Sequence, residues 1–279
     1  MKNGTDALRR ALPPVALACG IVAGVLRWRH LNTGFDTLGL PVGGSGTGLA
    51  LFFAALVALF AALCVFAWAR RENPLIAPIT ALSPATPVLA GLAAVAGLLS
   101  AGITLIGAFR TSSVWDMIGG LLMAAAAALT VPVMRHLTDS TDSPVRTASL
   151  VTVIWACFRL IEVYRNVSPN PAVSYYFYDL ISLITLILLT FYCSGYLFGR
   201  GTATRLYCII IAYFCFGTMT LVGDGLLCIT GESSWALCSD VLTYVFGLFF
   251  AFAVLVSMNR HSRQDLIAEL HRLAGDNAE

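Results

Sequence analysis

The chain has 279 residues, of which 58% are hydrophobic and only 11% are charged, and its formal net charge is +2. Soluble globular domains carry about 25% charged residues, so this composition excludes an ordinary water-soluble fold. The mean hydropathy of +0.82 excludes an intrinsically disordered chain. We therefore predict an all-α, polytopic integral membrane protein whose main partner is the lipid bilayer.

Eight apolar stretches are long enough to be membrane helices, because a span needs about 20 apolar residues and a barrel strand about 10 alternating ones. They form a single predicted transmembrane domain, residues 1–258. The expected spans are 11–31, 48–69, 86–109, 114–134, 148–165, 174–198, 204–227 and 235–258. The third and fourth spans are separated by so few residues that we expect a helical hairpin.

The first stretch has two interpretations. Arg9 and Arg10 precede a short apolar segment, a pattern that is also typical of a cleavable signal peptide over residues 1–20. The apolar segment is too short for a signal core, so we expect it to remain as the first helix. Arg27 and Arg29, near its far end, are expected to extend their charged groups outward to the membrane surface.

The distribution of basic residues predicts the orientation, because Lys and Arg accumulate in the cytoplasmic loops of membrane proteins. With eight spans and both termini cytoplasmic, most of the 17 basic residues fall on the cytoplasmic side. The outer side holds only Arg27, Arg29, Arg110 and Arg165, and Arg159 lies inside a span. The positive net charge therefore reflects topology, and nucleic-acid binding is not expected.

The functional signal lies in the ionisable residues of the last four spans, since a charge at a helix centre costs about 2.5 to 3.5 kcal/mol. Arg159 and Glu162 are three residues apart and share one helix face. Arg159 and Asp179 are equally far from Pro169 in the intervening turn, so an antiparallel hairpin places them at one depth. We expect a buried ion pair between Arg159 and Asp179.

A second pair of acids follows the same rule. Asp224 and Asp240 are equally far from Glu232, near the middle of the connection between the seventh and eighth spans, so we expect them to share a depth. Gly223 and Gly225 flank Asp224. This pattern favours either local unwinding at a polar site or the frayed end of a span.

Together these side chains predict an outward-facing polar pocket that apolar packing closes on the cytoplasmic side. Its expected ligand-binding residues are Arg159, Glu162, Asp179, Asp224 and Asp240. Their acidic excess favours a small cation, or a zwitterion whose ammonium group meets Asp224 or Asp240 and whose anionic group meets Arg159. The alternative is that these charges only neutralise one another and lock helices together.

Cys228 and Cys238 are candidates for a disulfide, because they flank a short loop on the side of the membrane where a disulfide can persist. The distance between their Cα atoms decides whether a bridge can form. The other cysteines are scattered singly in the spans, where cysteine behaves as a small hydrophobic residue.

The motifs of the common enzyme classes do not occur in the sequence. The four histidines lack the paired spacing of a metal site, and there is no Cys-x-x-Cys, His-Glu-x-x-His or Gly-x-Ser-x-Gly motif. Lys2 is the only lysine, which excludes a Schiff-base cofactor within a span. We expect no enzyme activity, no catalytic residue, no metal and no cofactor.

Residues 259–279 form the predicted cytoplasmic tail. Leu266, Ile267, Leu270 and Leu273 recur at helical spacing and define an amphipathic helix over 262–274. This helix is expected to bind a protein partner or a second copy of the chain, or to lie on the membrane surface.

Two functions are consistent with these features. The favoured one is a transporter-like or sensory membrane protein that binds a small solute from outside. The alternative is a non-catalytic scaffold or partner subunit that acts through helix packing and the C-terminal helix. The short loops favour a prokaryotic cytoplasmic membrane as the location.

Overall fold

The structure is a computed structural model that describes residues 2–34, 47–69, 82–137, 143–167, 173–200, 202–230 and 234–276. Within these ranges the side chains of 2–9, 63–69, 143, 167, 173–175 and 259–276 are not described. The described residues form eight helices and no strand. The helices are α1 (Lys2–Thr33), α2 (Thr47–Ala69), α3 (Ala85–Thr111), α4 (Val114–Arg135), α5 (Ser143–Val167), α6 (Val173–Leu197), α7 (Ala203–Thr230) and α8 (Trp235–Asp276).

The prediction of an all-α membrane bundle is confirmed. Seven helices are long and apolar enough to cross a membrane, and the described apolar part of α2, Thr47–Ala62, is shorter. The predicted hairpin is present, because α3 ends at Thr111 and α4 begins only at Val114. Ser112 makes the turn with a left-handed backbone, φ 52°, and the Ser113 side chain accepts a hydrogen bond from the backbone of α4.

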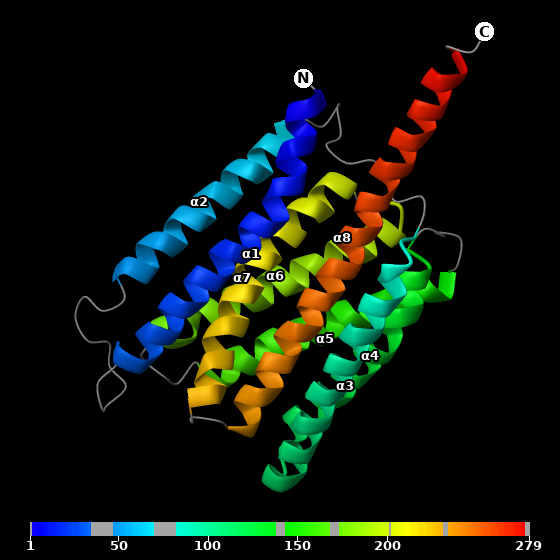
Figure 1. Ribbon diagram of the computed structural model, residues 1–279. Coiled ribbons are helices and arrows are strands. Elements are labelled where there is room, and N and C mark those ends of the chain that lie inside the picture. Colours follow the sequence, from blue (N-terminus) through cyan, green and yellow to red (C-terminus); the bar gives the residue numbers. More distant parts are fainter. Residues whose placement is uncertain are drawn as a thin grey trace.

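The predicted last span, 235–258, matches the apolar part of α8, Trp235–Met258. Helix α8 then continues without a break to Asp276 and projects beyond the bundle, so the predicted tail is an extension of the same helix (Figure 1). The predicted amphipathic face over 262–274 lies outside the side chains that the structure describes.

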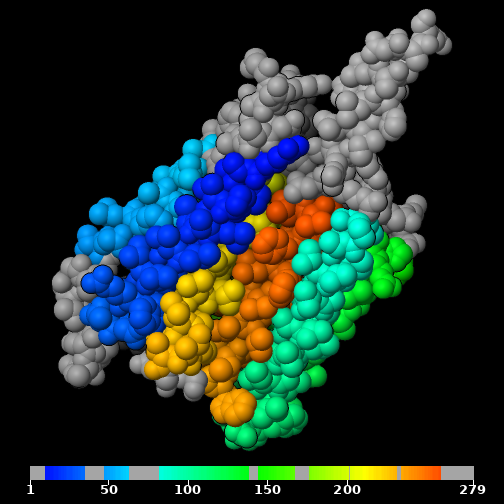
Figure 2. All heavy atoms as spheres, in the orientation of Figure 1, coloured from blue at the N-terminus to red at the C-terminus, as the bar shows by residue number. Residues whose placement is uncertain are grey.

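Helices α3 to α8 form a closed ring. Each packs on the next in chain order, and α8 returns to pack on α3 (Figure 1). Helices α1 and α2 lie outside the ring against α7, so α7 is enclosed by neighbours and is the most buried of the membrane-spanning helices. Figure 2 shows α1 in blue beside yellow α7, and orange α8 between α7 and turquoise α3. Both chain ends lie at the same end of the bundle, and we call the opposite end the outer end.

Large apolar side chains on the outside of the bundle are exposed, as expected for a surface that meets lipid. On α3, Leu92, Val95, Leu99 and Ile106 are all exposed, while Ala90, Ala93 and Ala101 are buried against neighbouring helices. Large residues thus face outward and small residues face inward, which allows close helix packing in lipid. The apolar helices are therefore suited to contact with a lipid bilayer.

The contact between α1 and α7 depends on two glycines. A Cβ atom on Gly20 would lie 2.6 Å from the Cys215 carbonyl oxygen, and one on Gly24 would lie 2.6 Å from Cβ of Val222. The spacing of four residues places both glycines on one face of α1, the arrangement by which membrane helices approach closely. The same face ends one turn later at Arg27.

We predict that Gly20→Ala lowers the thermal stability of the detergent-solubilised protein by about 1–3 kcal/mol, the usual cost of overpacking. The backbone of α7 cannot yield as a flexible side chain would. Gly91→Ala on α3 is the matched control, because nothing lies within 4 Å of its Cβ position. Equal melting temperatures for the two variants would contradict the close contact.

Candidate functional site

The five predicted ligand-binding residues all lie toward the outer end of the bundle, in two separate groups. Each group consists of one arginine and two acids. We call Arg159, Glu162 and Asp240 the open triad, and Arg27, Asp179 and Asp224 the closed triad. Ion pairs thus join α1 to α6 and α7, and α5 to α8, while Glu162 is paired with Arg159 within α5.

The open triad joins α5 to α8. Arg159 donates from Nη1 to Oε2 of Glu162, one turn along the same helix, at 2.7 Å. Its Nη2 donates to Oδ1 of Asp240 on α8. Glu162 is only 3% exposed, whereas Asp240 is 31% exposed, so the triad has a buried acid and an accessible one.

The predicted ion pair between Arg159 and Asp179 is wrong. Equal distance from a turn determines depth along the helices, but the direction in which each side chain points depends on helix rotation. Rotation of α5 turns Arg159 toward Asp240, while Asp179 is bound by a different arginine. Asp224 and Asp240 interact electrostatically across the α7–α8 pair, but each is paired with its own arginine.

The closed triad joins α1, α6 and α7. Arg27 donates from Nη2 to Oδ1 of Asp179 at 2.7 Å and to Oδ1 of Asp224 at 3.0 Å. Its Nη1 donates to Thr220 Oγ1 at 3.0 Å. The sequence predicts that Arg27 extends outward to the membrane surface, but the side chain is only 2% exposed. The two acids hold it in the bundle, because an ion pair there costs less than an unpaired charge on either side.

One sequence signal could have identified Arg27. Gly20, Gly24 and Arg27 are spaced by four and three residues, so they lie on one face of α1. A face that approaches another helix closely also carries its next polar residue into that contact. Gly223 on α7 completes the fit, because a Cβ there would lie 3.1 Å from Cδ of Arg27.

The glycines around Asp224 therefore have a packing role on at least one side. Helix α7 continues through Asp224 to Thr230, so the structure shows no unwinding at this acid. Gly223 provides space for the arginine side chain, and Gly225 has open space at its Cβ position.

Hydroxyl groups extend the closed triad toward the middle of the bundle. Thr220 Oγ1 and Ser182 Oγ are hydrogen-bonded to each other, and Ser182 Oγ donates to the Phe216 carbonyl at 2.7 Å. Ser182 and Thr220 are fully buried. This line of hydrogen bonds ends at a backbone carbonyl one turn below Thr220.

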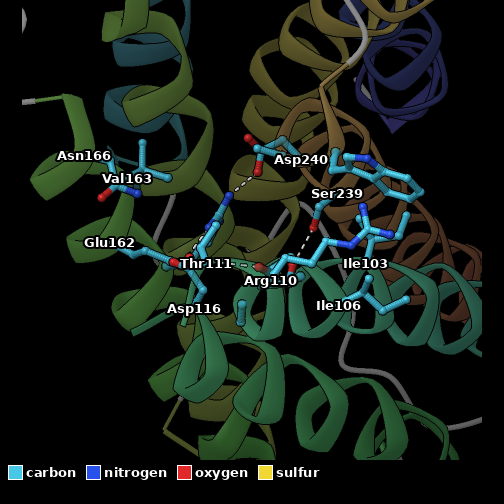
Figure 3. Close-up of a pocket in the computed structure, with 16 residues that line it drawn as sticks. Ile103, Ile106, Arg110, Thr111, Asp116, Glu162, Val163, Asn166, Ser239 and Asp240 are labelled. Atoms are coloured by element: carbon cyan, nitrogen blue, oxygen red, sulfur yellow. Dashed lines mark hydrogen bonds and ion pairs between the residues drawn. The ribbon is translucent and has the colours of Figure 1, made fainter. Parts of the chain in front are cut away.

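A cavity of about 470 Å³ lies beside the open triad (Figure 3). Arg159, Glu162 and Asp240 line it, whereas Asp179, Asp224 and Arg27 do not. Its walls come from α3, α4, α5 and α8. The other lining residues are Ile103, Thr104, Ile106, Gly107, Ala108, Arg110, Thr111, Asp116, Val163, Asn166, Trp235, Ala236 and Ser239.

Two arginines with aromatic partners lie around the outer end of the bundle. The Arg110 guanidinium lies 5.3 Å from the centre of the Trp235 ring, and both residues line the cavity. Arg165 lies 4.8 Å from the centre of the Trp115 ring, and neither of these residues lines the cavity. The aromatic faces help to hold both cations in place.

The acidic side of the cavity is supported by α4. Asp116 lies in the first turn of α4 and interacts electrostatically with Glu162. A Cβ on Gly119 would lie 3.1 Å from Oε2 of Glu162, so this glycine allows the carboxylate to lie against α4. The cavity lining therefore holds three acids and two arginines.

A cluster of hydroxyl groups ties α3 to α8 at the cavity wall. Ser100 Oγ lies 3.0 Å from both Ser239 Oγ and Thr243 Oγ1, and Thr104 Oγ1 lies 2.7 Å from Ser239 Oγ. Such interhelical hydrogen bonds contribute about 0.6 kcal/mol each on average in membrane proteins. They hold the two helices that carry Arg110 and Asp240 in register.

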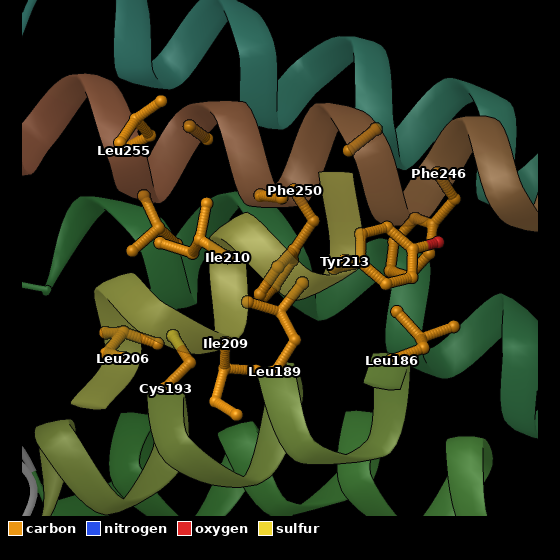
Figure 4. Close-up of a cluster of buried hydrophobic side chains, with 14 of the residues drawn as sticks. Leu186, Leu189, Cys193, Leu206, Ile209, Ile210, Tyr213, Phe246, Phe250 and Leu255 are labelled. Carbon is orange, nitrogen blue, oxygen red and sulfur yellow. The ribbon is translucent and has the colours of Figure 1, made fainter. Parts of the chain in front are cut away.

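Apolar packing closes the ring below the cavity and the triads (Figure 4). Trp155, one turn below Arg159, packs edge-on against Phe246 with ring centres 5.4 Å apart. Tyr213, Leu186 and Leu189 are completely buried in the same cluster. The ring is therefore filled with side chains beneath the charged layer.

The two candidate disulfide cysteines are neighbours but not bonded. Their sulfur atoms are 4.0 Å apart, and both are free thiols. They lie at the end of α7 and the start of α8, one turn beyond Asp224 and half a turn before Asp240. This separation is about twice the disulfide bond length of about 2.05 Å, so the sulfurs would have to move closer before a bond could form.

Comparisons with protein-family models, curated proteins and solved structures found no match for this chain. Among the described residues, no three His, Cys, Asp or Glu side chains are grouped so that they could hold a metal ion. The fold defines the class: a polytopic helical membrane protein with two arginine-centred triads at one end.

We predict that Arg27→Ala destabilises the protein by about 3–5 kcal/mol, the cost of breaking a buried ion pair from one side. Arg29→Ala is the matched control on the same helix, because Arg29 is exposed, and its effect is expected to stay within about 0.5 kcal/mol. Thermal unfolding in detergent measures both. Two equally mild variants would show that the closed triad contributes nothing to stability.

Mild oxidation is expected to link Cys228 to Cys238 within one chain. Thiol labelling of the two positions should fall together after treatment with a copper–phenanthroline oxidant and recover after reduction. Cys228→Ser should leave Cys238 fully reactive to the label. Persistent labelling of both cysteines in the oxidised wild type would rule out their close approach.

Proposed function

We propose that this membrane protein binds a small cationic or zwitterionic solute in the cavity beside the open triad. The observation that carries the proposal is a cavity whose floor, the open triad, is not fully neutralised. Arg159 is shared by Glu162 and Asp240, so the floor has one negative charge in excess. An ammonium group next to Asp240 would balance it.

The position of Arg110 indicates how a zwitterionic ligand would be oriented in the cavity. No ion pair joins Arg110 to an acid among the described residues, and its guanidinium lies against Trp235 at the cavity wall. Arg159 is less suited to bind the anionic group than the sequence predicts, because two carboxylates already occupy that arginine. A zwitterion would instead place its cationic end at Asp240 and its anionic end at Arg110.

The size and surroundings of the cavity favour a small ligand. Its volume of about 470 Å³ lies within the usual range of about 300–1,000 Å³ for ligand pockets. Ile103, Val163 and Ala236 add apolar wall next to the charged floor. Because apolar packing fills the ring below, a solute would enter from the outer end. This arrangement supports an outward-open transporter-like or sensory protein.

Ligand-induced thermal stabilisation tests this proposal. The probes are choline, glycine betaine, a set of amino acids with neutral side chains, and acetate as an anion without a cationic group. At a concentration of about 100 times Kd a ligand stabilises by about 2.7 kcal/mol. We expect cationic or zwitterionic probes to stabilise the protein and Asp240→Asn to abolish the effect.

A pair of arginine variants distinguishes the cavity from the surrounding surface. Arg110→Gln should weaken zwitterion binding about 10-fold or more, since a charge-assisted hydrogen bond contributes about 1.5–3 kcal/mol. Arg165→Gln should have no effect, although Arg165 is also an arginine stacked on a tryptophan at this end of the bundle. Stabilisation by acetate only, by no probe, or equally in the wild type and Asp240→Asn would contradict the proposal.

A scaffold function is the second candidate, supported by the uninterrupted extension of α8 to Asp276. A helix that projects beyond the bundle offers a surface to a partner or a second copy. In that case, removal of residues 260–279 should abolish partner co-purification or self-association, while Asp240→Asn should leave it unchanged. The reverse pattern would support the solute site.

A further inference from the structure

The closed triad has an unbalanced charge. The same nitrogen of Arg27, Nη2, contacts Oδ1 of Asp179 at 2.7 Å and Oδ1 of Asp224 at 3.0 Å. One positive charge therefore faces two carboxyl groups that are close neighbours. A net negative charge in a buried site is costly unless something neutralises it.

The surroundings of the triad do not provide that neutralisation. The titratable or charged side chains that face it are Tyr178 from α6, Cys228 from α7, Asp240 and Tyr244 from α8, and Arg159 from α5. Helix α2 contributes an aromatic contact, with the Phe53 and Tyr178 ring centres 5.2 Å apart. The only additional cation in this set is Arg159, which Glu162 and Asp240 already share.

The two triads differ in the space beside them. The open triad lines the 470 Å³ cavity, which leaves room for a ligand cation at Asp240. The closed triad does not line that cavity, and its Asp224 side chain is only 6% exposed. Arg27 lies against both carboxyl groups and would repel a metal cation. A proton is the cation that fits this position.

We infer that Asp179 and Asp224 together hold one exchangeable proton next to Arg27. The proton would come from water at the outer end and form an O–H bond with one carboxylate of the pair. Asp179, whose side chain is 22% exposed, is the point of entry, and Asp224 is the buried partner. The protonated carboxyl group can donate a hydrogen bond to the other, so the pair shares the proton.

The path of this proton leads to one side only. Below the pair, the hydrogen bonds pass from Arg27 to Thr220 and Ser182 and end at the Phe216 carbonyl. An arginine side chain does not release its proton in proteins, and the Phe216 carbonyl oxygen at the end of the line is too weak a base to accept one. The proton therefore exchanges with the outer end, and the site reports the acidity of that compartment.

The proton site has a consequence for the cavity, and this consequence rests on the proposed function. Asp240 interacts electrostatically with both Asp179 and Asp224. Protonation of the pair removes a negative charge near Asp240, so it should weaken binding of a cation in the cavity. Solute affinity should then fall as the outer compartment becomes more acidic.

Infrared spectroscopy of the whole protein in lipid nanodiscs tests the proton site directly. Exposed carboxyl groups are ionised at about pH 7, so a protonated-carboxyl C=O band at this pH reports a shielded acid. We expect such a band in the wild type, shifted in D₂O and lost reversibly as the pH is raised. Absence of the band, or a band that does not change with pH or D₂O, would overturn the proposal.

Variants assign the band to the closed triad. Asp179→Asn and Asp224→Asn should each remove it, because the remaining carboxylate and Arg27 then form a balanced pair. Asp240→Asn is the matched control from the open triad and should retain the band. Loss in Asp240→Asn with retention in both other variants would place the proton elsewhere and overturn the assignment.

The pH and D₂O dependence of the wild-type band tests the site even if a variant does not fold, as judged by size-exclusion chromatography. Failure of the proposed function is distinguishable, since the band requires no solute. A pH-dependent band without solute binding would retain the proton site and reject the solute site.

Discussion

Neutralisation of charge in a low-dielectric layer is the constraint on which the rest of this structure depends. Each buried arginine binds two carboxyl groups, at least one of them on another helix, and these ion pairs restrict how the helices can be rotated. Ion pairs of Arg27 link α1 to α6 and α7, and Arg159 connects α5 to α8. An unpaired charge in lipid would cost several kcal/mol, so the helices pack in the arrangement that pairs these groups.

Small residues leave the space that this ion pairing requires. Gly20 and Gly24 allow α1 to lie close to α7, and Gly223 leaves space for the stem of Arg27. Gly119 has the same role for Glu162 on the opposite side of the ring. The glycines and the charges therefore act together, because close backbone contact brings the long arginine side chain within reach of acids on other helices.

The two triads have the same composition and different surroundings, and this difference assigns their proposed roles. A cavity lies beside the open triad, where a ligand cation can complete the charge balance. The closed triad is more deeply buried, and a proton meets the same requirement there. The cavity beside one triad and the packed protein around the other thus distinguish a proposed solute site from a proposed proton site within one charged layer.

The sequence by itself determined the class and the number of helices, because these depend on the length of the hydrophobic runs. It also identified Arg159, Glu162 and Asp240 as members of one charged layer. The partner of each arginine was decided only by the tertiary structure, as Asp179 pairs with Arg27 instead of Arg159. Rise along a helix is constant and can be counted from a turn, whereas helix rotation and the neighbour on each face depend on packing among all eight helices.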